Sequence, residues 1–342
     1  MKNILQTLRD WVYIAVGWVF FYVTRETPSF SFHALIRLFC RSSGTSNDRM
    51  SKWIALCNKN VIDFDGQSGV LGIVNESKLA TYAEALREDG CLLFPSVLPK
   101  DICDRLTSFA LENPAIVRPM DGQSASVSRI ARFDPLNPTA VRYDLPTQQL
   151  LDNTDVQGLL ADPSLLAIAQ RYFDCPPRVD VLSMWWHSSF QASPDSEAAQ
   201  LYHFDMDRIR WLKVFIYLTD VGPDDGPHAF VLGSHRTGGI PAKMLSKGYA
   251  RLDDDDVLQC FGKEKCVELC APRGSLIVED TRGLHKGNVV KPGGRSRLML
   301  QLQFSNALFG AAVPAARLTT IRHPELIKRV QTDRLIYDQF LQ

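Results

Sequence analysis

The sequence predicts a mainly β fold with flanking helices, in the form of an antiparallel sandwich or barrel. Three observations lead to this prediction. Runs rich in β-branched and aromatic residues follow one another from residue 178 to residue 304. Clusters of Gly, Pro and Asp separate these runs, as turns do between short strands. Helical periodicity is confined mainly to the segments before and after this region, so helices are expected around the sheets rather than between their strands.

The strand-like runs define the predicted core. A short buried strand is expected at residues 91–94, and eight further strands are expected at residues 178–186, 200–205, 211–218, 228–231, 266–270, 275–278, 286–290 and 297–304. In the last run Leu298, Leu300 and Leu302 alternate with more polar positions. Because successive side chains of a strand point to opposite faces, this strand is expected to have one apolar and one polar face.

The flanking segments have helical patterns. Helices are predicted over residues 77–88, from residue 99 to residue 111, over residues 156–173 with a break at Asp162-Pro163, and over residues 324–341. Two segments are expected to cover a substrate, namely the polar loop 120–147 and the long insertion 236–265. We therefore expect an N-terminal helical region at 1–76, a jelly-roll domain at 77–309 and a helical tail at 310–342.

The N-terminal region is hydrophobic and aromatic. Residues 11–24 carry no charge, and as a helix they would be about 21 Å long, which is short of a hydrocarbon core of about 30 Å. Three interpretations remain open. This segment is a helix buried in the folded body, a helix that lies in a membrane interface, or part of an oligomer contact formed through residues 11–39.

The composition excludes several classes of protein. The 342 residues include 38 basic and 38 acidic residues, and a protein that binds nucleic acid by neutralising phosphates would have a basic excess. A disordered chain would contain fewer apolar residues than the 45% found here. The eight cysteines form no Cys-x-x-Cys pair. They are expected to be free thiols in a reducing compartment, which predicts a cytoplasmic protein with possible membrane association.

One short segment points to a metal site. In Tyr202-His203-Phe204-Asp205-Met206-Asp207, the side chains of His203 and Asp205 are expected on one face of an extended chain. His285 follows a predicted strand and is placed to meet them in a jelly roll. Two histidines and one carboxylate form the facial triad of non-haem Fe(II) oxygenases, which leaves positions open for other ligands. Asp207 has the same parity as Asp205 and is a rival ligand.

Arginines near the last strand are suited to bind a carboxylate. Arg297 opens that strand on its polar face, and a planar guanidinium grips a carboxylate with two hydrogen bonds. Arg295 has the same parity and is the alternative. His228 begins a strand and is a candidate to face the cavity, whereas His235 fits a structural turn. The candidate substrate contacts are Trp185, Trp186, His187, Arg129 and Arg132.

The order of these motifs resembles the phytanoyl-CoA dioxygenase family of Fe(II)/2-oxoglutarate oxygenases. The resemblance extends from Leu79 to Phe304. It includes Asp89-Gly90 before a strand, His203-Phe-Asp205, Asp225-Gly226-Pro227, Gly233-Ser234-His235, and finally His285, Asn288 and Arg297. It implies a double-stranded β-helix, the cupin-like jelly roll. It also implies that His203, Asp205 and His285 bind the metal and that Arg297 binds the far carboxylate of 2-oxoglutarate, with Phe215 and Tyr217 beside this co-substrate.

The resemblance also implies a reaction. With Fe(II), 2-oxoglutarate and O2, the protein is expected to hydroxylate an unactivated C–H bond of a small molecule or a lipid-like or natural-product substrate, and to release succinate and CO2. Asp205 argues against a halogenase, in which this carboxylate is lost. Desaturation and cyclisation by the same site remain open. Two alternatives are a jelly-roll isomerase or hydrolase that uses Zn or Mn, which Arg297 opposes, and a membrane-associated non-catalytic binding protein, which the complete triad opposes.

Overall fold

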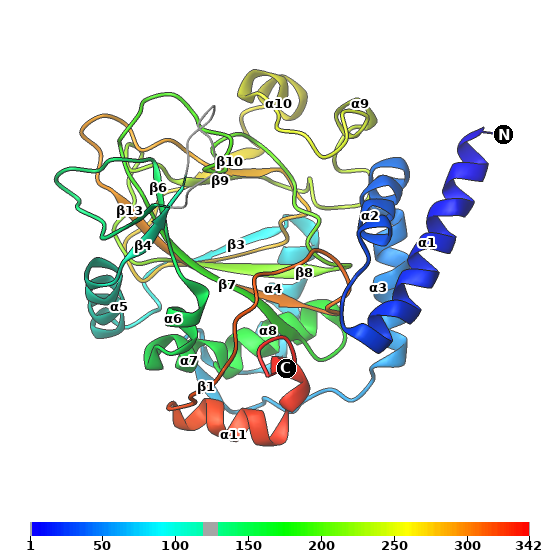
Figure 1. Ribbon diagram of the computed structural model, residues 1–342, viewed down its shortest axis with the longest axis horizontal. Helices are drawn as coiled ribbons and strands as arrows, with labels where there is room; N and C mark the ends of the chain where they lie inside the picture. Colours follow the sequence, from blue (N-terminus) through cyan, green and yellow to red (C-terminus); the bar gives the residue numbers. More distant parts are fainter. Residues whose placement is uncertain (1, 119–128, 342) are drawn as a thin grey trace.

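The computed structural model describes residues 2–118 and 129–341, and two facing antiparallel sheets form its centre (Figure 1). The larger sheet has the order β3-β11-β8-β13-β7-β6-β4-β5, and the smaller has the order β10-β9-β12. Together they form a jelly roll, as the sequence predicts. The strands of the larger sheet are β3 (Cys91–Phe94), β4 (Ala115–Val117), β5 (Arg129–Ala131), β6 (Arg142–Leu145), β7 (Arg178–His187), β8 (Trp211–Tyr217), β11 (Leu276–Glu279) and β13 (Arg297–Ser305). Those of the smaller sheet are β9 (His228–Val231), β10 (Cys266–Leu269) and β12 (His285–Gly287).

The larger sheet has two different faces. On β8, Leu212, Val214 and Ile216 point to one side, where they join the main hydrophobic core together with apolar side chains of the helices. Lys213 and Phe215 point to the other side, which faces the smaller sheet across a pocket. Because strand side chains alternate in direction, one sheet supplies both the main core and the floor of this pocket.

Most predicted strands are confirmed within one or two residues, but two predictions are wrong. Residues 200–205 do not form a regular strand, because only Tyr202 and His203 make isolated backbone bridges, to different partner segments. The predicted loop 120–147 contains β5 and β6, which pair with β4 and β7 and extend the larger sheet. Its residues 120–128 lie outside the described part of the chain. The C-terminal helix also ends earlier than predicted, since α11 (Pro324–Thr332) is followed by a separate turn of 3-10 helix, η1 (Arg334–Tyr337).

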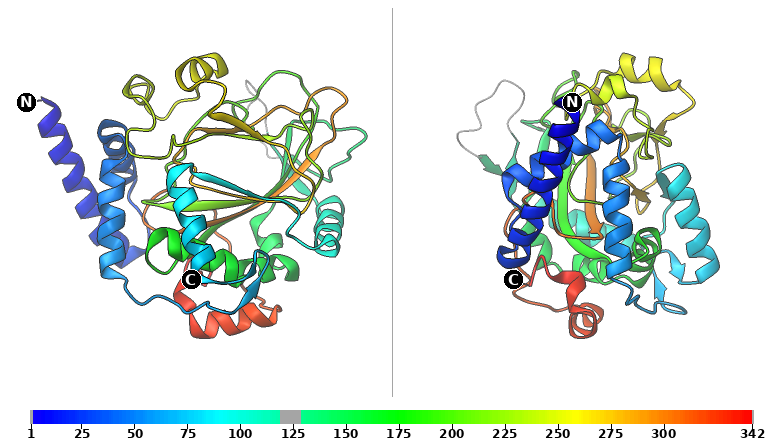
Figure 2. Two further views of the ribbon diagram at one scale, coloured as in Figure 1. Left: turned by 180° about the vertical axis from the view of Figure 1, so that it is seen from behind. Right: turned by 90° about the vertical axis from the view of Figure 1, so that its right-hand side faces the viewer.

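Helices cover the outer face of the larger sheet (Figure 2, left). They are α4 (Glu76–Glu88), α5 (Lys100–Glu112), α6 (Thr147–Leu151), α7 (Thr154–Leu160) and α8 (Pro163–Phe173). The break predicted at Asp162-Pro163 is confirmed, because the Asp162 carboxylate accepts the backbone N–H groups of Ser164 and Leu165 and so caps α8. Two short helices, α9 (Ala242–Leu245) and α10 (Asp254–Phe261), lie in the insertion 236–265. A small hairpin, β1 (Ser68–Gly69) and β2 (Gly72–Ile73), precedes α4.

The N-terminal region forms three helices that pack along one side of the sheets (Figure 1). They are α1 (Lys2–Thr24), α2 (Ser29–Ser42) and α3 (Thr45–Cys57). The fully buried Asp10 of α1 forms ion pairs with Arg37 and Arg41 of α2, which joins the first two helices. Among the described residues, no helix is both long enough and apolar enough to cross a membrane.

Three contacts attach these helices to the jelly roll. Trp18 of α1 stacks on Phe309 with ring centroids 4.5 Å apart, and Phe39 of α2 stacks on Phe204 at 5.3 Å. In α3, the Asp48 carboxylate accepts a hydrogen bond of 2.9 Å from Arg282, which also pairs with the buried Asp280. The inner face of α1 is therefore part of the folded body, as the first interpretation expected, and Phe39 supports a residue of the His203–Asp205 segment.

We predict that Phe39→Ala destabilises the protein strongly. Phe39 is 4% exposed, and removing a buried phenyl ring leaves a cavity that costs about 3 to 5 kcal/mol of unfolding free energy. Urea denaturation followed by fluorescence measures this loss. Phe30→Ala is the matched control, because Phe30 is 45% exposed and its truncation should cost under about 1 kcal/mol. Equal losses in the two variants would contradict the prediction.

Candidate metal centre and co-substrate pocket

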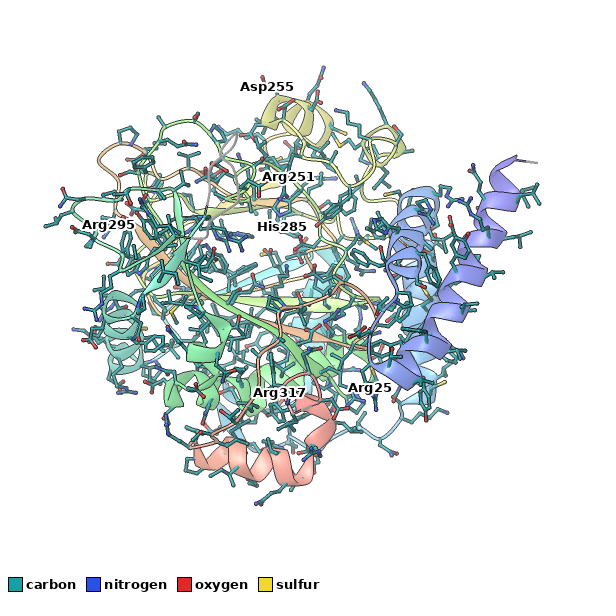
Figure 3. The ribbon with its side chains drawn as sticks, viewed as in Figure 1. Arg25, Arg251, Asp255, His285, Arg295 and Arg317 are labelled. Atoms are coloured by element: carbon teal, nitrogen blue, oxygen red, sulfur yellow. The ribbon has the colours of Figure 1, made fainter. Side chains whose placement is uncertain are left out.

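Backbone pairing brings the candidate ligands together. The amides and carbonyls of His203 and His285 exchange two hydrogen bonds, of 3.0 and 2.9 Å, and the Asp205 amide donates to the Thr281 carbonyl at 2.8 Å. The segment that contains His203 and Asp205 thus lies antiparallel to the chain before β12. One ligand atom of each of His203, Asp205 and His285 lies within 4.8 Å of the others, and all three residues are buried. Figure 3 shows His285 inside the molecule, between the two sheets.

The two imidazoles are arranged to present the same nitrogen. The Nδ1 atoms of His203 and His285 lie 2.9 Å from the Leu201 carbonyl and 3.0 Å from the Gly283 carbonyl, respectively. A carbonyl accepts, so Nδ1 carries the proton and the lone pair is on Nε2. Burial, followed by the neighbouring His285, holds the pKa of His203 well below its ordinary value. His203 is therefore neutral, as a metal ligand must be.

Asp205 is held by Lys213, a residue that the sequence did not single out. The Lys213 Nζ lies 2.6 Å from Asp205 Oδ2 and 3.0 Å from Asp207 Oδ2. Burial raises the pKa of the Asp205 carboxyl, but Lys213 and His285 outweigh this effect and keep it well below its ordinary value. Asp205 is therefore an anion at neutral pH. The sequence feature that could have identified Lys213 is its position in the apolar run of residues 211–217, where it shares a strand face with Phe215.

The rival ligand Asp207 does not join the cluster. Its carboxylate contacts Lys213, and the three residues whose ligand atoms converge are His203, Asp205 and His285. Asp207 is thus a second ion-pair partner of Lys213.

Arg297 is a buried cation that has no carboxylate partner among the described residues. It is 1% exposed. Nη1 donates to the Gly226 carbonyl, Nη2 lies 2.6 Å from His187 Nδ1, and Nε has no hydrogen-bond partner. Burial lowers the pKa of Arg297 to about 10, so it remains a cation at neutral pH. A buried charge of this kind is costly unless an anion compensates it.

The alternative arginine has a different environment. The Arg295 side chain is 61% exposed and forms a 2.7 Å ion pair with Asp225. It lies at the edge of the molecule, away from His285 (Figure 3). Its charge is already balanced at the surface, so it does not need a further anion.

A pocket of about 580 Å³ contains the three candidate ligands. Of the residues expected at the co-substrate, Phe215 lines this pocket, whereas Tyr217 is fully buried behind it and donates a 3.0 Å hydrogen bond to the Leu269 carbonyl. The other lining residues near the ligands include Lys213, Trp185, His187, His228, Gly287 and Gln301.

The expected substrate contacts divide into two groups. Trp185 and His187 line the pocket. Trp186 does not, because it follows Trp185 on β7, points to the opposite face and stacks on Phe133 at 4.6 Å. Arg129 and Arg132 are exposed outside the pocket lining, and Arg129 hydrogen-bonds to Thr139.

The outer part of the pocket has charged residues that the sequence did not identify. Arg142 lies over the ring of Trp185 at 4.5 Å and shares Asp144 with Arg118. Ion pairing with these two arginines lowers the pKa of Asp144 in spite of its burial, so this group of three has one net positive charge. Arg142 and Asp144 lie in the segment 120–147, which was predicted to be a loop, although Arg142-Tyr143-Asp144 alternates as a strand does.

This donor set fits Fe(II). The Nε2 atoms of two imidazoles and one carboxylate converge at the pocket wall, so they leave the pocket side of a bound ion open. The hydrogen bonds to Nδ1 and to Asp205 orient the ligands, as outer-shell contacts commonly do in metal sites.

Comparisons with known proteins identify the family of the chain. A family model described as phytanoyl-CoA dioxygenase (PhyH) matches residues 86–297, which is more than half of the chain. No curated protein sequence matches the chain. Similar solved structures include the epimerase SnoN in complex with Fe3+, alpha ketoglutarate and nogalamycin RO, with 17% identity, a TM-score of 0.46, and coverage of 72% of this chain and 89% of SnoN.

Two further structures are similar to the same extent. One is HygX from Streptomyces hygroscopicus with nickel and 2-oxoglutarate bound, with 14% identity, a TM-score of 0.47, and coverage of 73% of this chain and 96% of HygX. The other is the alpha ketoglutarate dependent carbocyclase SnoK, with 16% identity, a TM-score of 0.46, and coverage of 70% and 86%. The family match covers both candidate histidines, Asp205 and Arg297, and it shows that the chain belongs to the phytanoyl-CoA dioxygenase family of 2-oxoglutarate-dependent non-haem iron oxygenases.

Proposed function

We propose that this enzyme hydroxylates an unactivated C–H bond of a small molecule, of lipid-like or natural-product type, and releases succinate and CO2. The observation that carries the proposal is the buried Arg297 without a counter-charge, bonded to His187 of the pocket that contains the two-histidine, one-carboxylate cluster. A dicarboxylic co-substrate needs both features, because one end binds the metal and the other needs a cation. A hydrolase or isomerase that uses Zn or Mn needs no such cation.

Each residue then has a defined role. His203, Asp205 and His285 hold Fe(II), and Lys213 fixes the orientation of the Asp205 carboxylate. When bound, the iron and 2-oxoglutarate together supply the activation of O2. Arg297 binds the far carboxylate of 2-oxoglutarate, and His187 holds the guanidinium in place through its Nδ1 atom. Phe215 lies against the co-substrate. Trp185 and Arg142 contact the substrate at the outer part of the pocket.

The eight free cysteines support the proposal that the enzyme works in a reducing, cytoplasmic environment. There it would operate at a membrane surface, for which α1 provides the contact. An exposed apolar stripe runs along α1 at helical spacing, with exposed fractions between 52% and 77%, and consists of Leu5, Leu8, Val12, Val16, Val19 and Val23. Asp10, the one acidic residue of α1, is fully buried, whereas Arg9 is exposed. Arg25 and Glu26, directly after the helix, are both exposed.

This pattern favours a lipid surface over a second copy of the chain. A helix that lies in the interface buries an apolar stripe and places cations beside anionic head groups. Among the described side chains of α1 the exposed charge is Arg9, which suits an anionic head group.

We predict that the three ligands bind Fe(II) together with 2-oxoglutarate. Anaerobic addition of both to the wild-type protein should produce a visible metal-to-ligand charge-transfer band. His203→Ala and Asp205→Ala should weaken or abolish the band and the retention of iron after dialysis, because each removes one of three ligands. His33→Ala, which changes an exposed histidine, should leave both unchanged. Absence of the band with well-folded wild-type protein would refute the proposed function.

We predict that Arg297→Met greatly weakens 2-oxoglutarate binding without loss of stability. Removing one partner of a buried charge pair costs about 2 to 5 kcal/mol, so the Kd should rise roughly 30-fold to 3,000-fold. The melting temperature without ligand should not fall, because the buried cation lacks a counter-charge. Arg295→Gln is the control and should change the Kd less than about threefold. An unchanged Kd in Arg297→Met would exclude this role.

We predict that the α1 stripe binds anionic membranes. Wild-type protein should co-sediment with vesicles that contain phosphatidylserine and bind much less to pure phosphatidylcholine. Val12→Glu with Val19→Glu should abolish binding and leave the charge-transfer band intact. The control is Lys59→Glu with Val61→Glu, at two exposed positions outside α1. A concentration-dependent dimer of wild type that these α1 substitutions dissociate, without vesicle binding, would assign the stripe to an oligomer contact instead.

A further inference from the structure

Two arginines at the outer part of the pocket carry more charge than their protein partner balances. Arg118 and Arg142 form ion pairs of 2.5 and 2.8 Å with the same carboxylate, that of Asp144, and all three residues line the pocket. Asp144 is 9% exposed and remains an anion, so one positive charge is left over. A purely structural ion pair at this place would need only one of the two arginines.

Three guanidinium nitrogens of this group have no hydrogen-bond acceptor in the described part of the chain. Arg142 donates from Nε and Nη2 to Asp144 Oδ1, and Arg118 donates from Nε to Asp144 Oδ2. Nη1 of Arg142 and both Nη atoms of Arg118 can therefore serve a further acceptor. Guanidinium groups suit carboxylate and phosphate oxygens best, because they can donate two parallel hydrogen bonds to them.

The arginines are separated from the region of the metal and the co-substrate. The Arg142 guanidinium lies 4.5 Å from the centre of the Trp185 ring, whose centroid is 6.3 Å from that of Phe215. In the larger sheet, β6 with Arg142 is two strands from β13 and three from β8, or about 10 and 14 Å. An anion bound to Arg118 and Arg142 is therefore a second anion, distinct from a co-substrate that extends from the metal to Arg297.

Much of the remaining pocket wall is apolar. The apolar lining residues include Ile116, Val181, Leu182, Trp185, Phe215 and Pro314. The polar Gln148 of the same lining is already engaged, since it exchanges hydrogen bonds of 2.8 and 3.0 Å with the backbone of Arg317. A ligand that fills this pocket is thus expected to combine apolar surface with an anionic group at its outer end.

We propose that the substrate is an amphipathic anion whose carboxylate or phosphate group binds Arg118 and Arg142, while its apolar part extends along the pocket toward the metal. This inference rests on the proposed function and names the substrate class of the same site. Arg118 and Arg142 are its binding residues. Asp144 is a positioning residue, because it holds both guanidinium groups at the pocket.

The test uses three probes that share an octyl chain, namely octanoate, octyl phosphate and octan-1-ol. Each is titrated anaerobically into the Fe(II) protein loaded with 2-oxoglutarate, and the charge-transfer band is recorded. At least one of the two anions should shift the band and bind roughly tenfold or more tightly than octan-1-ol. The anion that binds better distinguishes recognition of a carboxylate from recognition of a phosphate.

The variant Arg118→Gln with Arg142→Gln should raise the Kd of the better anion about 10-fold to 100-fold, as expected for lost hydrogen bonds to a charged group. Arg118→Lys with Arg142→Lys keeps both charges and should recover part of the affinity. Arg105→Gln is the matched control, because Arg105 also pairs with two carboxylates but lies outside the pocket lining. It should bind all three probes as the wild type does.

The outcomes separate this inference from the proposed function. If the wild type forms no band with 2-oxoglutarate, the proposed function fails, and this inference fails with it. If the band forms but neither anion binds, or octan-1-ol binds as tightly, this inference alone is overturned. A loss of 2-oxoglutarate affinity in the double Gln variant as large as that in Arg297→Met would assign the two arginines to the co-substrate and would also overturn it.

Discussion

The site depends on one stretch of backbone pairing between two segments that are far apart in the sequence. His203 and His285 exchange two amide–carbonyl hydrogen bonds, and Asp205 adds a third with Thr281. These bonds fix the register, and a slip of one residue would turn the side chains to the opposite face. Since His203 and Asp205 share a face, this single register brings both to His285. Everything else in the pocket is arranged around the point where these three side chains meet.

The surroundings of the cluster hold it from both sides. On the pocket side, Lys213 grips Asp205 and keeps it charged. On the opposite side, Phe204 lies between the two ligands in sequence and stacks on Phe39 of α2. The hydrophobic N-terminal helices are thus joined physically to the metal-binding segment. A ligand set that must keep its geometry needs such packing, because unsupported side chains would lose it to rotamer freedom.

The interior of the jelly roll is polar where a packed core would be apolar. Arg297 has no counter-charge, and Glu279 has an oxygen without a partner. Both lower the stability of the protein. The unbalanced cation is the expected mark of an anion site, since an anionic co-substrate would compensate the charge of Arg297. The contrast with Arg295, whose charge is balanced at the surface, shows why two arginines of equal parity differ in role.

The sequence alone determined the fold class, most strand positions, the family and the identities of the candidate ligands, because these depend on local alternation and on the order of short motifs. It missed β5 and β6, since a short strand within a polar segment forms only when a sheet edge is there to pair with. It also missed Lys213 and Arg142, which line the pocket. Each is an ordinary charged residue by composition, and only tertiary structure places it in a pocket. The choice between Arg297 and Arg295 likewise required burial and ion pairs, which no local pattern encodes.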